Sequence, residues 1–220
     1  LILRFYPAVD SLYSDSVILS QALTKEVLGA FATVISIYTY VPYFTGIYKG
    51  KTKPHAFSWI VWALILGITC TAQIVKKGGA GAWITIFETL ATSTVAIIAL
   101  ISGEKNITRS DWYSFLAALA AIPLWVMTGS PLLSVILVTI ISISGFWPTL
   151  RKSWSLPWSE VAQTYILSGP AYALSLMALQ NMTWTTAFYP AMLMIVNTGF
   201  GLTLLIRRRY IGNPEKSPHI

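Results

Sequence analysis

The stretch YVPYFTGIYKGKTKPHAFSWIVW, residues Tyr40–Trp62, joins an apolar segment that contains a proline to a second, tryptophan-rich apolar segment through a cationic turn. The same order of parts recurs in GFWPTLRKSWSLPWSEVAQTY, residues Gly145–Tyr165. Proline removes a hydrogen bond from a helix and either bends or ends it. The first stretch is therefore either only the end of one helix and the start of the next, or part of a unit that the chain contains twice.

The whole chain has the composition of a helical membrane protein. Its 220 residues are 55% hydrophobic and 10% charged, with a mean hydropathy of +0.65, whereas about 25% of residues are charged in soluble domains. A membrane-spanning helix needs about 20 mostly apolar residues. An all-α integral membrane protein with seven transmembrane helices is predicted from seven such blocks, of which the fourth is the shortest: roughly Glu26–Tyr48, Ala56–Ile74, Ala82–Ile101, Asp111–Thr128, Pro131–Leu150, Val161–Leu179 and Thr185–Ile206.

The net charge of +7 fits the same class. The cations lie in short loops at the ends of the apolar blocks, which favours a lipid bilayer over a nucleic acid as the partner. Cys70, the single cysteine, lies within the second block and is predicted to be a small packing residue. Residues 1–25 contain Arg4, Asp10 and Asp15, and they predict an extracytoplasmic arm lying on the membrane surface rather than an eighth span.

The loops divide the cations unequally between the two sides of the membrane. Seven spans place 4 of the 15 Lys and Arg residues on the side of the N-terminal arm, namely Arg4, Lys25, Lys76 and Lys77. The other 11 lie on the opposite side, which includes the tail of residues 207–220. Because cytoplasmic loops are enriched in Lys and Arg, this asymmetry predicts an outside N-terminus and a cytoplasmic C-terminus.

The chain contains an internal repeat. Matched positions drift smoothly from a shift of 106 to a shift of 101: Pro42 with Pro148, Pro54 with Pro157, Trp62 with Tyr165, and WITIF (Trp83–Phe87) with WTTAF (Trp184–Phe188). The first unit covers residues 26–103, the second covers 131–206, and 104–130 form a linker helix. Since the first helix of each unit starts on the same side, the repeats are parallel. The opening stretch thus belongs to a 3+1+3 arrangement.

This plan, with a proline near the cytoplasmic end of the first helix of each unit, resembles the SWEET and PQ-loop superfamily of membrane transporters, including the half-size SemiSWEETs. The resemblance covers residues 26–206, and the stretches KPHAFSW and GEKNITRSDW look most like a bacterial branch. The Pro-Gln dipeptide of the family reads Pro42–Tyr43 and Pro148–Thr149 here. The resemblance implies a multi-pass carrier in the bacterial inner membrane that moves a sugar or a similar metabolite.

The resemblance also implies a substrate contact. Carriers of this family hold their substrate with an asparagine on the third helix of each unit, and Asn197 matches this position in the second unit. The repeat partner of Asn197 is Ala96. An amide within a span also serves as a hydrogen-bonding contact between helices, which is the alternative role.

Glu88 is the one acidic residue placed within a predicted span. Because a charge near the bilayer centre costs about 2.5–3.5 kcal/mol on insertion scales, Glu88 should face the interior of the bundle or water. Thr92 follows it on the same helix face, and Tyr189 precedes Asn197 on the matching face of the last span. Together with Gln73, these residues are predicted to bind the solute, and Glu88 either couples proton movement to transport or only makes hydrogen bonds.

Further residues are candidates for gating. Trp62 and Tyr165 occupy repeat-related positions near the cytoplasmic ends of their spans, where aromatic residues either close an exit or anchor the helix at the headgroups. Gly169–Pro170 interrupts the sixth span and forms a hinge candidate together with Pro42 and Pro148. Static kinks that only shape the packing are the alternative.

The sequence contains no Walker loop, GxGxxG, CxxC or HExxH motif. We therefore expect neither an enzyme nor a bound cofactor or metal. The predicted function is a carrier that moves a small polar solute by alternating access, and a monomer suffices because both units lie in one chain. The alternative is a non-transporting receptor or a structural subunit of a larger membrane complex on the same fold, and a homo-oligomer stays open as well.

Overall fold

The computed structural model describes residues 6–50, 54, 56–103, 109–144, 150, 153–155, 157–159 and 162–211, and the side chains of these residues apart from 6–15, 110, 111, 114 and 159. Within these ranges the chain is helical and contains no strand, which confirms the predicted all-α class. The helices are α1 (Tyr6–Tyr48), α2 (Ala56–Val75), α3 (Trp83–Ser102), α4 (Arg109–Thr128), α5 (Pro131–Ser144), α7 (Ala162–Ala178) and α8 (Trp184–Tyr210), with 3-10 turns η2 (Gly79–Ala82) and η3 (Pro157–Ser159).

Each predicted apolar block overlaps one of these helices, and residues 145–149 and 161 of the fifth and sixth blocks lie outside the described residues. Within the described part of the chain, four helical segments are long and apolar enough to cross a membrane: Ser16–Tyr48, Ala56–Val75, Gly79–Ser102 and Trp184–Tyr210. A helix of 20 residues, such as α2, is about 30 Å long, close to the thickness of the hydrocarbon core. Phe115–Thr128 and Pro131–Ser144 are shorter apolar helices. The fold is therefore compatible with a membrane-embedded helical protein.

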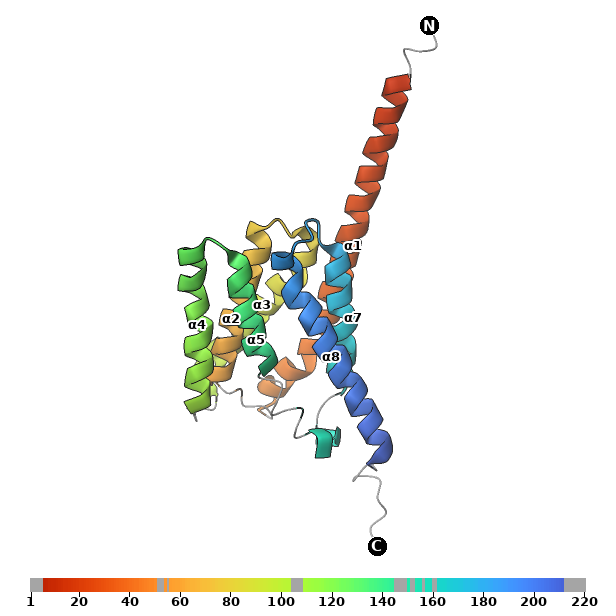
Figure 1. The fold of residues 1–220 in the computed structure, drawn as a ribbon. Helices are drawn as coiled ribbons and strands as arrows, with labels where there is room; N and C mark the ends of the chain where they lie inside the picture. The colour runs from red at the N-terminus through yellow and green to blue at the C-terminus, as the bar shows by residue number, and fades with distance from the viewer. Residues whose placement is uncertain are drawn as a thin grey trace.

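The packing order is the same at the start and at the end of the chain. Helix α3 packs against both α1 and α2, and α8 packs in the same way against both α5 and α7. The two groups meet where α1 packs on α7 and where α2 packs on α5. Helix α4 lies at the edge of the bundle, against α5 and α2 (Figure 1). The first helix of each group therefore contacts the second helix of the other.

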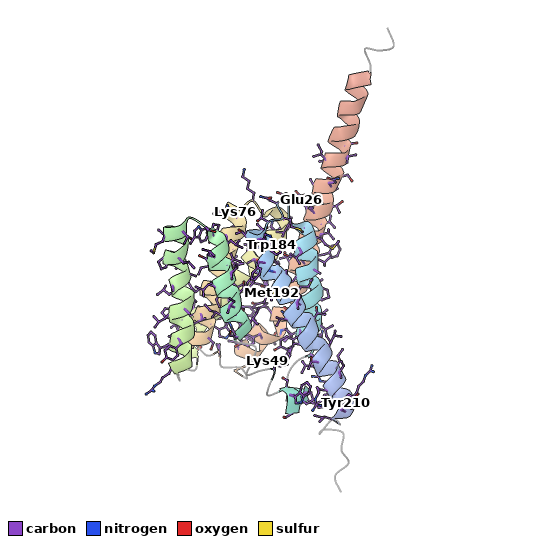
Figure 2. All side chains as sticks on the ribbon, in the orientation of Figure 1. Glu26, Lys49, Lys76, Trp184, Met192 and Tyr210 are labelled. Carbon is purple, nitrogen blue, oxygen red and sulfur yellow. The ribbon has the colours of Figure 1, made fainter. Side chains whose placement is uncertain are left out.

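The two termini lie at opposite ends of the bundle, and α1 and α5 run in the same direction (Figure 1). Glu26, Lys76 and Trp184 mark one end, and Lys49 and Tyr210 mark the other (Figure 2). The connections α2–α3 and α7–α8 both lie at the end marked by Lys76, so the two helical hairpins that they form have the same orientation.

The interior and the exterior differ in polarity as they do in a membrane bundle. Large apolar side chains such as Leu90, Ile101 and Val126 are exposed, and Thr69, Gln73 and Thr85 are fully buried. Exposed apolar side chains of this kind are typical of a surface covered by lipid or by another protein. Of the three buried polar residues, Gln73 makes a hydrogen bond between helices, to the Thr186 carbonyl of α8, and such bonds associate helices in lipid.

The course of α1 differs from the sequence expectation. We predicted an arm over residues 1–25 on the membrane surface, but α1 is one helix of 43 residues from Tyr6, and it projects beyond the bundle (Figure 1). The stretch ALTKE (Ala22–Glu26) contains four strong helix formers and no breaker, so nothing ends the helix at residue 25. Side chains on this projecting part, such as Leu19 and Leu23, are exposed.

Pro42 and Pro170, which were predicted to bend or break their helices, do not end them. Helix α1 continues past Pro42 to Tyr48, and α7 runs through Gly169–Pro170 without ending. A proline inside a helix removes a single backbone hydrogen bond. Packing of the flanking residues maintains the helix at such a site, as Tyr40 and Tyr43 do around Pro42. The third hinge candidate, Pro148, lies outside the described residues.

Candidate functional site

A cavity of about 340 Å³ lies at the centre of the bundle, between the two helix groups. Helices α1, α2, α3, α5, α7 and α8 all contribute to its lining, and none of the described residues of α4 does. The lining residues are Thr39, Tyr40, Tyr43, Trp59, Trp62, Ile65, Leu66, Glu88, Thr92, Ser142, Thr164, Tyr165, Ser168, Tyr172, Tyr189, Leu193 and Asn197. Four of the five predicted solute-binding residues and both predicted aromatic gating residues are in this set.

Glu88 connects three helices through its carboxylate. Its side chain is 8% exposed and lines the cavity. Oε1 accepts a hydrogen bond from Ser36 Oγ of α1 at 2.9 Å, and Oε2 accepts one from the Tyr172 hydroxyl of α7 at 2.7 Å. Since α3 and α7 belong to different groups, the carboxylate links the two halves of the molecule.

Thr92 and Asn197 face the same cavity but also make hydrogen bonds within their own helices. Thr92 Oγ1 donates to the Glu88 carbonyl at 2.7 Å, and Asn197 Nδ2 donates to the Leu193 carbonyl at 2.8 Å. The Asn197 Oδ1 atom has no hydrogen-bond partner among the described residues. The amide therefore presents an acceptor to the cavity instead of joining two helices.

Aromatic side chains form much of the cavity wall. The Trp59 and Trp62 rings lie edge to face at a centroid distance of 5.2 Å, and Trp59 Nε1 donates to the Tyr43 hydroxyl at 2.9 Å. Tyr165 lines the cavity from α7 and packs edge to face on Phe200 at 4.5 Å. Trp62 and Tyr165, matched by the repeat, thus line one common cavity.

Gln73 was predicted to bind the solute, but it does not line the cavity. It is fully buried on α2, more than a turn beyond Leu66, and its Nε2 donates to the Thr186 carbonyl of α8 at 2.9 Å. Its Oε1 has no partner in the described part of the chain. Gln73 therefore joins two helices, which is the alternative role of an amide in a membrane protein.

Hydrogen bonds between the two hairpins close the bundle at the end marked by Lys76 and Trp184 (Figure 2). We call this contact, between residues 76–81 and 175–181, the hairpin clasp. Gln180 N donates to the Gly78 carbonyl at 2.9 Å, and Ser175 Oγ donates to the Gly81 carbonyl at 2.7 Å. Nearby, Lys25 Nζ donates to the Leu179 carbonyl at 2.8 Å.

The sequence analysis missed the hairpin clasp, although its signal is present. The stretch GGAGA (Gly78–Ala82) is rich in glycine, and Gly79 has a φ of +64°. A Cβ at Gly81 would meet the Ser175 carbonyl oxygen at 2.6 Å. Glycine is therefore required there for the close approach of two backbones.

The analysis also missed Tyr172 and Ser36 as partners of Glu88. Tyr165, Ser168 and Tyr172 recur at helical spacing on one face of α7, so the sequence held a signal for Tyr172. No pattern in the sequence marks Ser36, because serine is common in spans and usually bonds its own backbone. Only the packing of α1 beside α3 brings Ser36 to the carboxylate.

Gly169, one of the predicted hinge residues, lies at a close contact between two helices. Gly169 on α7 faces Thr198 on α8 so closely that an added Cβ would overlap the Thr198 hydroxyl. Gly67, its repeat counterpart on α2, has open space where a Cβ would lie.

Among the described residues no three His, Cys, Asp or Glu side chains come together as a metal site would require.

No protein-family model, curated protein or solved structure matches this chain.

Proposed function

We propose that the chain is a membrane carrier that moves a small polar solute by alternating access through the central cavity, on the plan of the SWEET and PQ-loop superfamily. The observation that supports this best is the position of the cavity between two helix groups of like packing. Carriers built from repeats bind their solute at the repeat interface near the middle of the bilayer. Glu88, Thr92, Tyr189 and Asn197 are the proposed solute-binding residues.

The 3+1+3 arrangement is part of this proposal. In its favour, the third helix of each group packs between the other two, and the contact of α1 with α7 repeats as the contact of α5 with α2. Helix α4 has no counterpart and no described residue in the cavity lining, as expected for a linker. Packing relations of this kind support the proposal of two parallel units related by an axis along the membrane normal.

Alternating access on this plan would require the hairpin clasp to open. In the described conformation the clasp closes the outer end, beyond Glu88, while Trp62 at the other end is 42% exposed. Opening would separate the α2–α3 hairpin from the α7–α8 hairpin and break their mutual hydrogen bonds. Pro42 and Gly169–Pro170 are the proposed hinges, since prolines and glycines at helix contacts permit bending.

We further propose a bacterial inner membrane with the N-terminus outside and the C-terminus in the cytoplasm. Lys49 lies at the end of the bundle where the C-terminus lies (Figure 2). Arg109, the first residue of α4, and Arg207–Arg209, in the last turn of α8, are at the ends of helices that lie on the same side (Figure 1). With Cys70 replaced by serine, a cysteine at Lys49 or at Lys76 tests this orientation in intact cells. A membrane-impermeant maleimide should label the Lys76 variant, and preferential labelling of the Lys49 variant would reverse the orientation.

Transport itself is tested in liposomes that contain the purified full-length protein. Counterflow of labelled sugars, amino acids and amines should be protein-dependent for at least one compound, and Asn197→Ala should reduce it about tenfold, because a truncated polar contact costs roughly 1–2 kcal/mol. Thr203→Ala is the control, since Thr203 lies on the same helix outside the cavity lining and bonds its own backbone. Absence of any protein-dependent flux would argue against a carrier.

One observation favours the alternative of a structural subunit. The projecting part of α1 exposes apolar side chains, including Leu19 and Leu23, beyond the end of the bundle. An apolar face of this kind fits a partner within a larger membrane complex. Stable co-purification of a partner that is lost on Leu19→Glu, together with absent flux, would favour the subunit over the carrier.

A further inference from the structure

The carboxylate in the cavity has no positive partner. None of the described Lys, Arg or His side chains lines the cavity, so Glu88 is the one charged group among its described lining residues. Glu88 Oε1 accepts one hydrogen bond from Ser36, and Oε2 accepts one from Tyr172. Because a carboxylate oxygen can accept about two hydrogen bonds, each oxygen has room for one more. A buried charge is stable only when it is paired. The cavity therefore has both the charge and the free lone pairs to take a cation.

The walls of the cavity suit the same kind of ligand. Seven aromatic residues line it, and the Trp59 and Trp62 rings meet at 87°, which gives two walls at a right angle. The face of an indole attracts a cation through its quadrupole, and aromatic cages bind quaternary ammonium groups in this way. Tyr165 adds a further ring from the other half of the molecule.

Several hydrogen-bond donors near Glu88 and Asn197 are used within the protein. Trp59 Nε1 donates to Tyr43, the Tyr172 hydroxyl donates to Glu88, and Thr92 and Asn197 Nδ2 donate to carbonyls of their own helices. Acceptors remain, namely the Glu88 lone pairs and Asn197 Oδ1. An anion would be repelled by the Glu88 carboxylate, because no cationic side chain among the described lining residues offsets that charge. A protonated amine supplies hydrogen-bond donors and positive charge, and a quaternary amine supplies positive charge without any donor.

From these three features we infer that the solute is a small organic cation, with a protonated or quaternary amine held between the Glu88 carboxylate and the aromatic walls. The inference rests on the proposed carrier function, because it takes the cavity as the place where the solute binds. The volume of about 340 Å³ suits a compound of this size, at the lower end of the range of about 300–1,000 Å³ for small-molecule sites.

The test uses matched probes on the purified full-length protein in detergent. Thermal unfolding is followed by tryptophan fluorescence with choline, tetramethylammonium, ethanolamine, glucose, or 3,3-dimethylbutan-1-ol, the uncharged carbon analogue of choline. At least one of the three amines should raise the Tm in a saturable way, and dimethylbutanol and glucose should not. Equal shifts with choline and dimethylbutanol would overturn the inference.

Substitutions test whether the amine binds to the Glu88 carboxylate and to the aromatic wall that includes Trp62. Glu88→Gln keeps the shape of the side chain and should weaken the amine about tenfold or more, while Glu26→Gln, an exposed glutamate outside the cavity, should leave it unchanged. Trp62→Leu should weaken it roughly fivefold and Trp62→Phe less, because phenylalanine keeps a ring face. Trp83→Leu is the control, since Trp83 is partly exposed and lies outside the lining.

The outcomes separate this inference from the proposed function. Stabilisation by glucose that depends on Glu88, without any effect of the amines, would overturn the cationic solute and leave the carrier standing. Amine binding that is unchanged in Glu88→Gln would also overturn the inference of a cationic solute. If none of the probes shifts the Tm and the liposome screen finds no flux, both the cationic solute and the carrier fail.

Discussion

The Tyr172 hydroxyl of α7 lies 2.7 Å from Glu88 Oε2 of α3, and this hydrogen bond crosses from one helix group to the other inside the cavity. Both side chains are nearly inaccessible, at 4% and 8% exposure. The contact therefore fixes the position of the carboxylate and at the same time joins the two halves. It connects the packing of the bundle with the proposed binding chemistry.

Tyr172→Phe should lower the free energy of unfolding by about 1 kcal/mol, because a single hydrogen bond between helices is lost and the ring packing is kept. Reversible unfolding in mixed micelles, monitored by circular dichroism, measures the change. A double-mutant cycle with Glu88→Gln should show a non-zero coupling energy. Tyr113→Phe on α4 is the control, since Tyr113 is exposed and outside the cavity, and additive effects of Tyr172 and Glu88 would contradict the contact.

The variant Glu88→Gln also tests whether transport is coupled to proton movement. A carboxyl group that binds a proton in one state of the carrier and releases it in the other makes uptake respond to an imposed pH gradient. We expect uptake into liposomes to respond to the gradient in the wild type and to be indifferent to it in Glu88→Gln, which cannot titrate. Wild-type uptake that ignores the gradient would exclude proton coupling and would leave facilitated diffusion.

Gly169 and Gly67 form a matched pair for testing the contact between α7 and α8. Gly169→Ala should lower the Tm and the transport rate, because its Cβ would overlap Thr198 and push the helices apart. Gly67→Ala should be neutral or stabilising by up to about 1 kcal/mol, since the site is open and alanine favours the helix. Thermal unfolding of both variants checks this, and equal effects at the two positions would contradict the described packing.

The hairpin clasp predicts a change in accessibility. Ser175→Ala removes the hydrogen bond to the Gly81 carbonyl and should shift the population toward the outward-open form. In a Cys70→Ser background that carries Thr92→Cys, maleimide added from outside should then react several-fold faster, as expected for a lost contact of about 1 kcal/mol. Thr203→Ala serves as the control, and an unchanged labelling rate would show that the clasp does not control the outer opening.

Much of the fold was predictable because hydrophobic blocks and helix lengths are local properties. The predicted block Ala56–Ile74 corresponds to α2, and Thr185–Ile206 lies within α8. The extent of α1 was less predictable, because polar residues before residue 25 indicate a departure from the membrane but do not end a helix. Trp62 and Tyr165, which the predicted repeat pairs with each other, both line the central cavity.

The sequence by itself determined the helical class and the apolar segments, since both depend on composition and spacing along the chain. The tertiary structure alone decided which polar residues share a cavity. Gln73 and Glu88 are both polar groups within apolar helices, yet Gln73 joins α2 to α8 and Glu88 faces the cavity. The reason is that the rotation of each helix about its axis, and hence the partner of each polar side chain, depends on packing against helices distant in the sequence. The same packing brought Ser36 and Tyr172 to Glu88 and closed the hairpin clasp over them.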